Sequence, residues 1–293
     1  MKAIDRPLTQ LINNNQQFII PVFQRDYSWS TAQCDDLWKS ILTASESQSF
    51  LGSIVYISAG GGAGFGKWLV IDGQQRLTTL TLLLIALRDA IEERNWTGSD
   101  ESPNVDRIDA YYLKNVFENG DRRYKLALRR ADNSTLKTLT DGENIDELDD
   151  NGSNHSPRIL ENYQHFKNLL ESDDCDFDVI YRGIGRLNIV DVTLERSVDN
   201  PHLVFESMNS TGVDLSQSDL VRNFLLMRID ESEQAELYEN IGRISKITSE
   251  LLLRGSTIFC ETISHYKPSP ANPFDSIKFT RGSRTIGTPG MPV

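Results

Sequence analysis

The sequence has few of the residues that hold disulfide-bonded or metal-bound proteins together. It contains three cysteines in 293 residues, at positions 34, 175 and 260, and four scattered histidines. An odd number of cysteines so far apart fits neither a disulfide framework nor a zinc site of the usual ligand spacing. These absences argue against the disulfide-rich and zinc-binding classes of protein.

Long hydrophobic runs are also missing. The densest apolar stretch, Leu77 to Leu87, contains three threonines and is shorter than the roughly 20 residues that a membrane-spanning helix needs. The first ten residues, MKAIDRPLTQ, lack the apolar segment of a signal peptide. We therefore expect a cytosolic protein with no membrane contact.

Positive charge is scarce over the whole chain. There are 30 Lys and Arg against 42 Asp and Glu, which gives a net charge of −12 and argues against a surface coated for non-specific nucleic-acid binding. One segment, Asp121 to Arg130, carries five basic residues and one acid. It predicts either a local DNA-binding groove or a solvated strand face beside an acidic loop. The candidate DNA-binding residues are Arg122, Arg123, Lys125, Arg129 and Arg130.

The hydrophobic periodicity predicts an α+β fold with a small mixed sheet, followed by a mostly helical region. Strands are expected at 17–23, 50–58, 68–71, 124–129 and 188–194, and helices at 34–47, 75–93, 107–117, 158–171 and 177–187, with one more opening at Asn133 or Ser134 and three between 201 and 253. The helix at 75–93 is apolar on most faces, which predicts a central helix packed against the sheet. The glycine-rich AGGGAGFGK predicts a long, mobile hairpin loop.

The segment VIDGQQRLTTL places polar residues at the start of this central helix. A helix N-terminus presents unpaired N–H groups and partial positive charge, which suit a phosphate or another anion. Arg76 in the first turn is unfavourable against that dipole unless an anion lies nearby, and its guanidinium matches phosphate oxygens. The segment therefore predicts an anion site. The alternative is that Asp72 caps the helix and pairs with Arg76.

Several roles remain open for the polar residues of this segment. Asp72 could orient Arg76, hold Mg²⁺ or position a water, and Gln74 and Gln75 could hydrogen-bond a base, a ribose or an attacking water. The segment is not a Walker loop, because no G-x-x-x-x-G-K-[ST] is present.

Two further clusters combine polar residues with element ends. Gln24 and Arg25 leave a strand in IPVFQRDYSW, where the aromatic residues either stack on a base or pack at the rim of the core. The second cluster, VFESMNSTGVDLSQSDLVRN, reads as a helix–turn–helix connection of undetermined role. Its candidate residues are Asn209, Gly212, Asp219 and Asn223.

The order of four motifs resembles the N-terminal domain of GmrSD-type, modification-dependent restriction enzymes, over roughly residues 8–228. These motifs are IPxxQRxYxW, FLGSIV, DGQQRLTTL and FESMNxxGxxLxxxDLxRN. The resemblance implies a relative of the ParB/sulfiredoxin fold in which this strand–turn–helix binds a nucleoside triphosphate. By the same resemblance, Mg²⁺ at Asp72 assists hydrolysis, with Asp72, Gln75 and Arg76 as catalytic residues. The residues implied in nucleotide binding are Gln24, Arg25, Gly73, Gln74 and Arg76.

The resemblance also implies an organisation and a function. We expect a nucleotide-binding domain at 1–96, a mainly helical region at 97–265 whose short strand pair completes that domain, and a flexible tail at 266–293. His265 is isolated, so we expect the family's metal-dependent nuclease to be absent, supplied by another chain or lost through truncation. Slow, Mg²⁺-dependent triphosphate hydrolysis would gate restriction of modified phage DNA, and homo-oligomer formation is left open. The alternatives are a non-hydrolysing sensor of nucleotide or modified DNA, a nuclease with metal at Asp72, and a structural adaptor.

Overall fold

A mixed β-sheet forms one layer of the protein. The computed structural model describes residues 1–21, 24–62, 64–143, 155–172, 174–195 and 199. Within this part of the chain the sheet has six strands in the order β1-β6-β3-β4-β2-β5. The strands are β1 (Lys2–Pro7), β2 (Gln16–Ile19), β3 (Ser49–Gly62), β4 (Phe65–Asp72), β5 (Leu126–Ala127) and β6 (Leu187–Leu194).

Both parallel and antiparallel pairs occur in the sheet. β1 pairs with β6, and β3 pairs with β4, in antiparallel fashion. The pairs β3–β6, β2–β4 and β2–β5 are parallel. The expected α+β class with a mixed sheet is therefore confirmed. Because β6 lies between β1 and β3, the regions predicted at 1–96 and 97–265 contribute strands to the same sheet.

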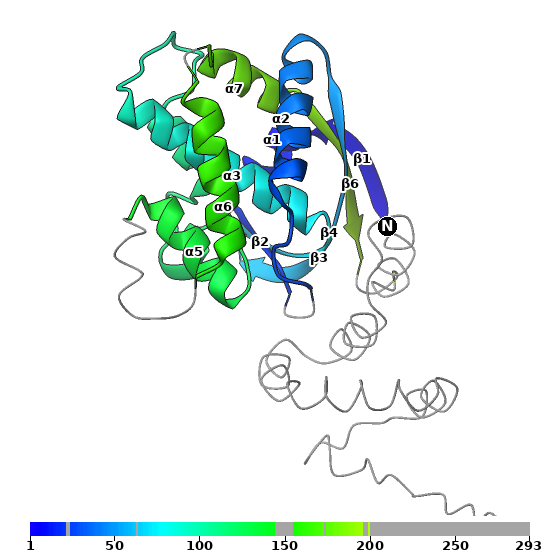
Figure 1. Ribbon diagram of the computed structural model, residues 1–293. Helices are drawn as coiled ribbons and strands as arrows, with labels where there is room; N and C mark the ends of the chain where they lie inside the picture. Colours follow the sequence, from blue (N-terminus) through cyan, green and yellow to red (C-terminus); the bar gives the residue numbers. More distant parts are fainter. Residues whose placement is uncertain (22–23, 63, 144–154, 173, 196–198, 200–293) are drawn as a thin grey trace, which may run out of the picture. The chain divides into compact units, whose positions relative to one another are not determined.

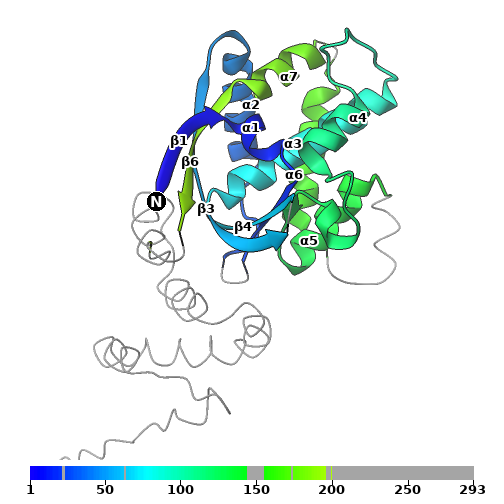
Figure 2. The same ribbon diagram turned by 180° about the vertical axis from the view of Figure 1, so that it is seen from behind.

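The helices of the described chain lie on one side of the sheet (Figures 1 and 2). None of them is both long and apolar enough to cross a membrane. They are α1 (Leu8–Ile12), α2 (Thr31–Glu46), α3 (Gln74–Glu93), α4 (Val105–Ile108), α5 (Arg130–Asp141), α6 (Pro157–Leu170) and α7 (Phe177–Gly185), with a π-helical turn η1 (Asp109–Leu113) and a 3₁₀ turn η2 (Gly120–Arg123).

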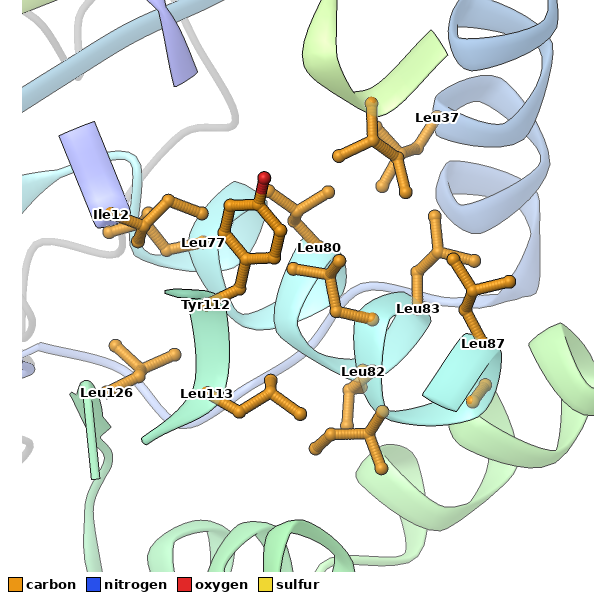
Figure 3. Close-up of a cluster of buried hydrophobic side chains, with 14 of the residues drawn as sticks. Ile12, Leu37, Leu77, Leu80, Leu82, Leu83, Leu87, Tyr112, Leu113 and Leu126 are labelled. Carbon is orange, nitrogen blue, oxygen red and sulfur yellow. The ribbon is translucent and has the colours of Figure 1, made fainter. Parts of the chain in front are cut away.

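Helix α3 is the centre of the core. It spans 20 residues, most of them buried, and packs against α6, α4, η1 and α5. Figure 3 shows leucines from several sides of α3 reaching towards Ile12 of α1, Leu37 of α2, and Tyr112 and Leu113 of η1. The prediction of a central apolar helix at 75–93 is confirmed. Its near-complete burial fixes the position of its N-terminus relative to the sheet.

The glycine-rich segment was predicted wrongly as a long, mobile loop. All of its glycines except Gly64 belong to the strands: β3 continues to Gly62, β4 begins at Phe65, and the register pairs Gly61 with Gly66. Backbone hydrogen bonds between the two strands need no side chains, so a low β-propensity did not prevent pairing. The tip of the hairpin is therefore short.

Other boundaries also differ from the sequence-based expectation. The helix expected at 107–117 ends at Leu113, and the strand expected at 124–129 is reduced to Leu126–Ala127. Helix α5 begins at Arg130, because the Asn133 side chain accepts a hydrogen bond from the Leu128 N–H at 2.9 Å and lies inside the helix instead of capping it. The helices expected between 201 and 253, and the tail expected at 266–293, lie outside the described residues.

Leu83 tests the dependence of the fold on α3. Its side chain is fully buried in the centre of the helix, so we expect Leu83→Ala to lower the free energy of unfolding by about 2–5 kcal/mol through a cavity. Urea denaturation measures this loss. Leu42→Ala, at a position 42% exposed on α2, is the control and should cost less than about 1 kcal/mol. Equal losses in the two variants would contradict a core centred on α3.

Candidate functional site

The polar site is built around the turn between β4 and α3. Gly73 lies in the left-handed region, with φ of 91°, which glycine adopts without strain. A Cβ at this position would lie 2.9 Å from the Ser53 carbonyl oxygen, so the turn also packs tightly on β3. α3 begins here with no side-chain cap and no acid in its first turn. The N-terminal charge of the helix dipole is therefore not neutralised by a capping side chain.

Asp72 and Arg76 pair with each other beside this turn. The Arg76 Nη1 atom lies 3.8 Å from the Asp72 carboxylate, and both side chains are 31% exposed. The same nitrogen donates a hydrogen bond to the Ser53 carbonyl at 2.9 Å. The alternative reading is therefore correct about the ion pair, whereas Asp72 does not cap α3. A half-buried pair at this distance contributes little stability, so an incoming anion could displace it at low cost.

Gln75 joins the start of α3 to the segment after β2. Its Oε1 atom accepts hydrogen bonds from the Ser28 N–H at 2.9 Å and the Trp29 N–H at 3.3 Å, and its Nε2 atom donates to the Asp26 carbonyl at 3.3 Å. The side chain is buried. Both ends of the amide are thus engaged with backbone, which assigns Gln75 a positioning contact in this structure.

Gln24 makes a second link between the two segments. Its Nε2 atom donates to the Ile71 carbonyl at the end of β4, at 2.7 Å. Arg129 donates to the Gln24 carbonyl and pairs with Asp26 at 3.2 Å. The structure therefore brings IPVFQRDYSW and DGQQR together, although they are separated by more than 40 residues in the sequence.

Tyr27 and Asn162 extend this network into the core. The Tyr27 hydroxyl lies 2.6 Å from Thr79 Oγ1 on α3, and Asn162 of α6 donates to the Tyr27 hydroxyl and to the Trp29 carbonyl, both at 2.8 Å. Burial raises the pKa of the Tyr27 hydroxyl and raises that of the neighbouring Cys34 thiol to about 12. Both groups are therefore protonated at neutral pH and serve as hydrogen-bonding and packing groups.

A small pocket lies beside the first turn of α3. Its interior is about 10 Å³, which is space for about one water molecule. Gln74 is only 8% exposed, and its buried Oε1 atom has no hydrogen-bond partner among the described residues. The pocket is lined by Ile20, Arg25, Tyr27, Gln74, Gln75, Thr78, Leu128, Arg129 and Asp132.

The predicted site residues therefore divide over two sides of the turn. Arg25 and Gln74 line the pocket. Arg76 instead lies over Gly52 of β3, because a Cβ added to Gly52 would lie 3.0 Å from the guanidinium carbon of Arg76. Asp132 was not among the predicted site residues, yet it lines the pocket and accepts a hydrogen bond from the Tyr27 N–H at 2.7 Å. No motif surrounds Asp132 in the sequence, so only the fold identifies it.

The basic segment at 121–130 is divided by burial. Lys125 is buried, its Nζ atom donates to the Asn14 carbonyl at 2.6 Å, and burial lowers its pKa to about 8. Arg129 is buried too, while Arg122, Arg123 and Arg130 are exposed. Lys125 and Arg129 thus face the interior in this structure. DNA contact by the exposed arginines stays a prediction.

A comparison with known protein families shows which family the chain belongs to. The sequence matches the family model described as GmrSD restriction endonuclease, N-terminal domain, over residues 8–226. The chain belongs to this family. No curated protein matches it.

The GmrSD N-terminal match includes both segments joined by Gln75, and it continues through the cluster of Asn209, Gly212, Asp219 and Asn223. That cluster lies outside the described residues, and its role stays a prediction. The resemblance inferred from the motif order is confirmed. Kinship with the ParB/sulfiredoxin fold stays a prediction.

Gly73 gives a direct test of the turn. We expect Gly73→Ala to lower the free energy of unfolding by about 1–3 kcal/mol, because alanine is strained in the left-handed region and its Cβ would approach Ser53 and Ile54 of β3. Chemical denaturation measures the loss. Gly62→Ala is the control, because a Cβ there meets nothing within 4 Å. A neutral Gly73→Ala would contradict the tight turn.

Lys125 predicts a pH dependence of stability. Its pKa is lowered by burial to about 8, against 10.5 in the unfolded chain. Between these two pH values the unfolded chain binds more protons, so stability from this residue rises with pH. We expect the free energy of unfolding of the wild type to increase relative to that of Lys125→Met from pH 8 to pH 10. A constant difference between the two proteins would contradict the burial of a lysine with a lowered pKa.

Proposed function

We propose that this chain binds a nucleoside triphosphate at the start of α3 and hydrolyses it slowly with Mg²⁺, and that this step gates DNA restriction. The supporting observation is the first turn of α3, which has no side-chain cap and no acid and carries Arg76. Such a helix end favours an anion through its N–H groups and its dipole. A capped helix would have filled this position with its own side chain.

Two arginines on opposite sides of the turn can serve the phosphates. Arg76 lies on the β3 side, where it donates to the Ser53 carbonyl and lies 3.8 Å from Asp72. Arg25 lies on the pocket side. Phosphoryl transfer is accelerated chiefly by positioned positive charge. We therefore assign Arg76 and Arg25 to charge stabilisation.

The residues present suit a magnesium ion held mainly by its substrate. The described residues contain no group of three metal-binding side chains. Mg²⁺ commonly takes only one or two protein carboxylates and completes its shell with phosphates and waters, and Asp72 offers one carboxylate beside the turn. Bound there, Mg²⁺ would neutralise phosphate charge. Asp72 would exchange its contact with Arg76 for the ion and leave Arg76 to the phosphates.

Restriction endonucleases cut DNA, and the family takes its description from such an enzyme. We assign DNA cleavage to a nuclease module outside the described residues, because the matching family model is described as the N-terminal domain of such an enzyme. Nucleotide turnover in this domain would license that module, with modified DNA as the substrate.

A non-hydrolysing sensor is the second candidate. It is favoured by Gln75, whose amide is engaged at both ends with the backbone of Asp26, Ser28 and Trp29. Gln75 would have to break these hydrogen bonds to the backbone of residues 26–29 before its amide could position an attacking water. A sensor would keep nucleotide affinity without turnover.

The test is the melting temperature of the purified chain with ATP, GTP, CTP or UTP, each with Mg²⁺. A ligand that binds only the folded state stabilises it by about 2.7 kcal/mol at 100 times its dissociation constant. We expect one or more nucleotides to raise the melting temperature, and Arg76→Ala to lose most of the shift. Arg158→Ala is the matched control, because Arg158 is also a first-turn arginine paired with an acid.

Phosphate release separates the two candidates. Turnover in the wild type that falls at least about tenfold in Asp72→Asn would support hydrolysis with Mg²⁺ at Asp72. A shift without turnover would support the sensor. Absence of a shift with all four nucleotides would refute the phosphate site and leave Asp72 and Arg76 as a surface ion pair.

A further inference from the structure

The loop between η1 and β5 exposes two adjacent apolar side chains. Val116 is 57% exposed and Phe117 is 89% exposed, the largest exposed fraction among the exposed large hydrophobic residues of the described chain. A solvated phenylalanine beside a valine is unfavourable unless something covers it, and exposed apolar patches often mark interaction sites.

The loop is held rigidly against the sheet. The buried Asn115 donates hydrogen bonds to the Gln16 carbonyl at 3.0 Å and the Arg122 carbonyl at 2.9 Å, and accepts one from the Gln16 N–H at 3.3 Å. Gln17 of β2 donates to the Tyr124 carbonyl at 2.9 Å, and a β-bridge joins Lys114 to Tyr124. Both ends of the loop are therefore fixed, and the exposure of Phe117 is built into the fold.

Two arginines lie at the base of the loop, where Asn115 donates hydrogen bonds to their backbone carbonyls. Arg122 and Arg123 are exposed, and the Arg122 guanidinium lies 5.5 Å from the centre of the Phe65 ring, which holds it at the β3–β4 hairpin. Lys137 lies 2.6 Å from Asp121, and together with Lys67 it lowers the pKa of that carboxyl.

Three acids lie in or beside the loop, and two of them are paired with a basic side chain. Asp121 pairs with Lys137, Asp141 lies 3.4 Å from Arg123, and Glu118 accepts a hydrogen bond from Asn15 at 3.5 Å. The loop and its printed neighbours thus carry four basic side chains (Lys67, Arg122, Arg123 and Lys137) and three acids (Glu118, Asp121 and Asp141), so this position is less acidic than a chain of net charge −12 is on average. A ligand with anionic groups on its outside and apolar groups inside would match the arginines and the exposed Phe117 best.

We propose that Val116–Arg123 is a DNA contact in which Phe117 inserts at a base step while Arg122 and Arg123 hold the flanking phosphates. DNA combines a phosphate surface with stacked bases, and apolar wedges with adjacent arginines are a common way of binding and bending it. A stable protein interface needs about 1,000 Å² of buried surface, whereas the apolar patch here consists of two side chains. This inference rests on the part of the proposed function in which the chain acts on DNA, and it does not require nucleotide hydrolysis.

The experiment uses the full chain and a 20-bp unmodified duplex that carries 2-aminopurine at several steps. Anisotropy gives the dissociation constant, and 2-aminopurine fluorescence reports unstacking. We expect binding with increased fluorescence in the wild type. Phe117→Ala should weaken binding about tenfold, in line with the loss of one stacked base, and abolish the fluorescence change. Phe117→Trp should retain both.

Two matched variants separate the wedge from general effects. Phe50→Ala removes another exposed phenylalanine, 63% exposed at the start of β3, and should bind DNA as the wild type does. Arg122→Ala with Arg123→Ala should reduce the slope of log affinity against log salt by about 2, because each phosphate contact contributes about 0.9. All variants should melt within a degree or two of the wild type, since these side chains are exposed.

Wild-type affinity in Phe117→Ala, or no duplex binding by the wild type, would overturn the inference. A lower sedimentation mass in Phe117→Ala with unchanged DNA binding would also overturn it, by assigning the patch to a second copy of the chain. The nucleotide shift of Phe117→Ala is measured in parallel. If Phe117→Ala keeps the nucleotide-induced melting shift but loses DNA binding, its defect lies in the DNA contact alone. Arg76→Ala should instead lose the nucleotide-induced shift and keep DNA binding.

Discussion

The side-chain amide of Gln75 is the contact on which the site depends. With three hydrogen bonds to the backbone of Asp26, Ser28 and Trp29, it fixes the segment after β2 against the first turn of α3. Arg25 and Gln74 line one pocket because of this attachment. Because the amide is buried, its loss would leave backbone N–H groups unsatisfied as well as release the segment. Burial of α3 in turn fixes the helix on which Gln75 is carried.

Local signals in the sequence were sufficient for several core elements and for the family. The apolar helix at 75–93 and the hairpin strands before it follow from periodicity, and the turn at Gly73 follows from the Asp-Gly pair before a helix. The family followed from the order of short motifs. The helix, the strands, the turn and each single motif are determined by residues close together in the chain, where propensity and pattern act.

Features that depend on distant residues could not be predicted. Nothing in the sequence around Lys125 indicates that its stem and ammonium group are buried against the Asn14 carbonyl. Asp132 and Asn162 reach the site from α5 and α6, and each is an ordinary polar residue in its own segment. The division of Arg25 and Arg76 over two sides of the turn is likewise a product of packing. In each case tertiary contacts decide what a side chain can do.

The position of β6 has a consequence for synthesis of the protein on the ribosome. β1 lies at the edge of the sheet with β6 as its neighbour, and β6 begins at Leu187. β1 is therefore synthesised first and stays unpaired until β6, which ends at Leu194, has also been synthesised. During much of that time β3 has one edge without a neighbouring strand. Non-local strand pairing of this kind slows folding and leaves edges open to aggregation. The short, charged β1 (KAIDRP) is a poor template for wrong pairing, which suits a strand that must remain unpaired for so long.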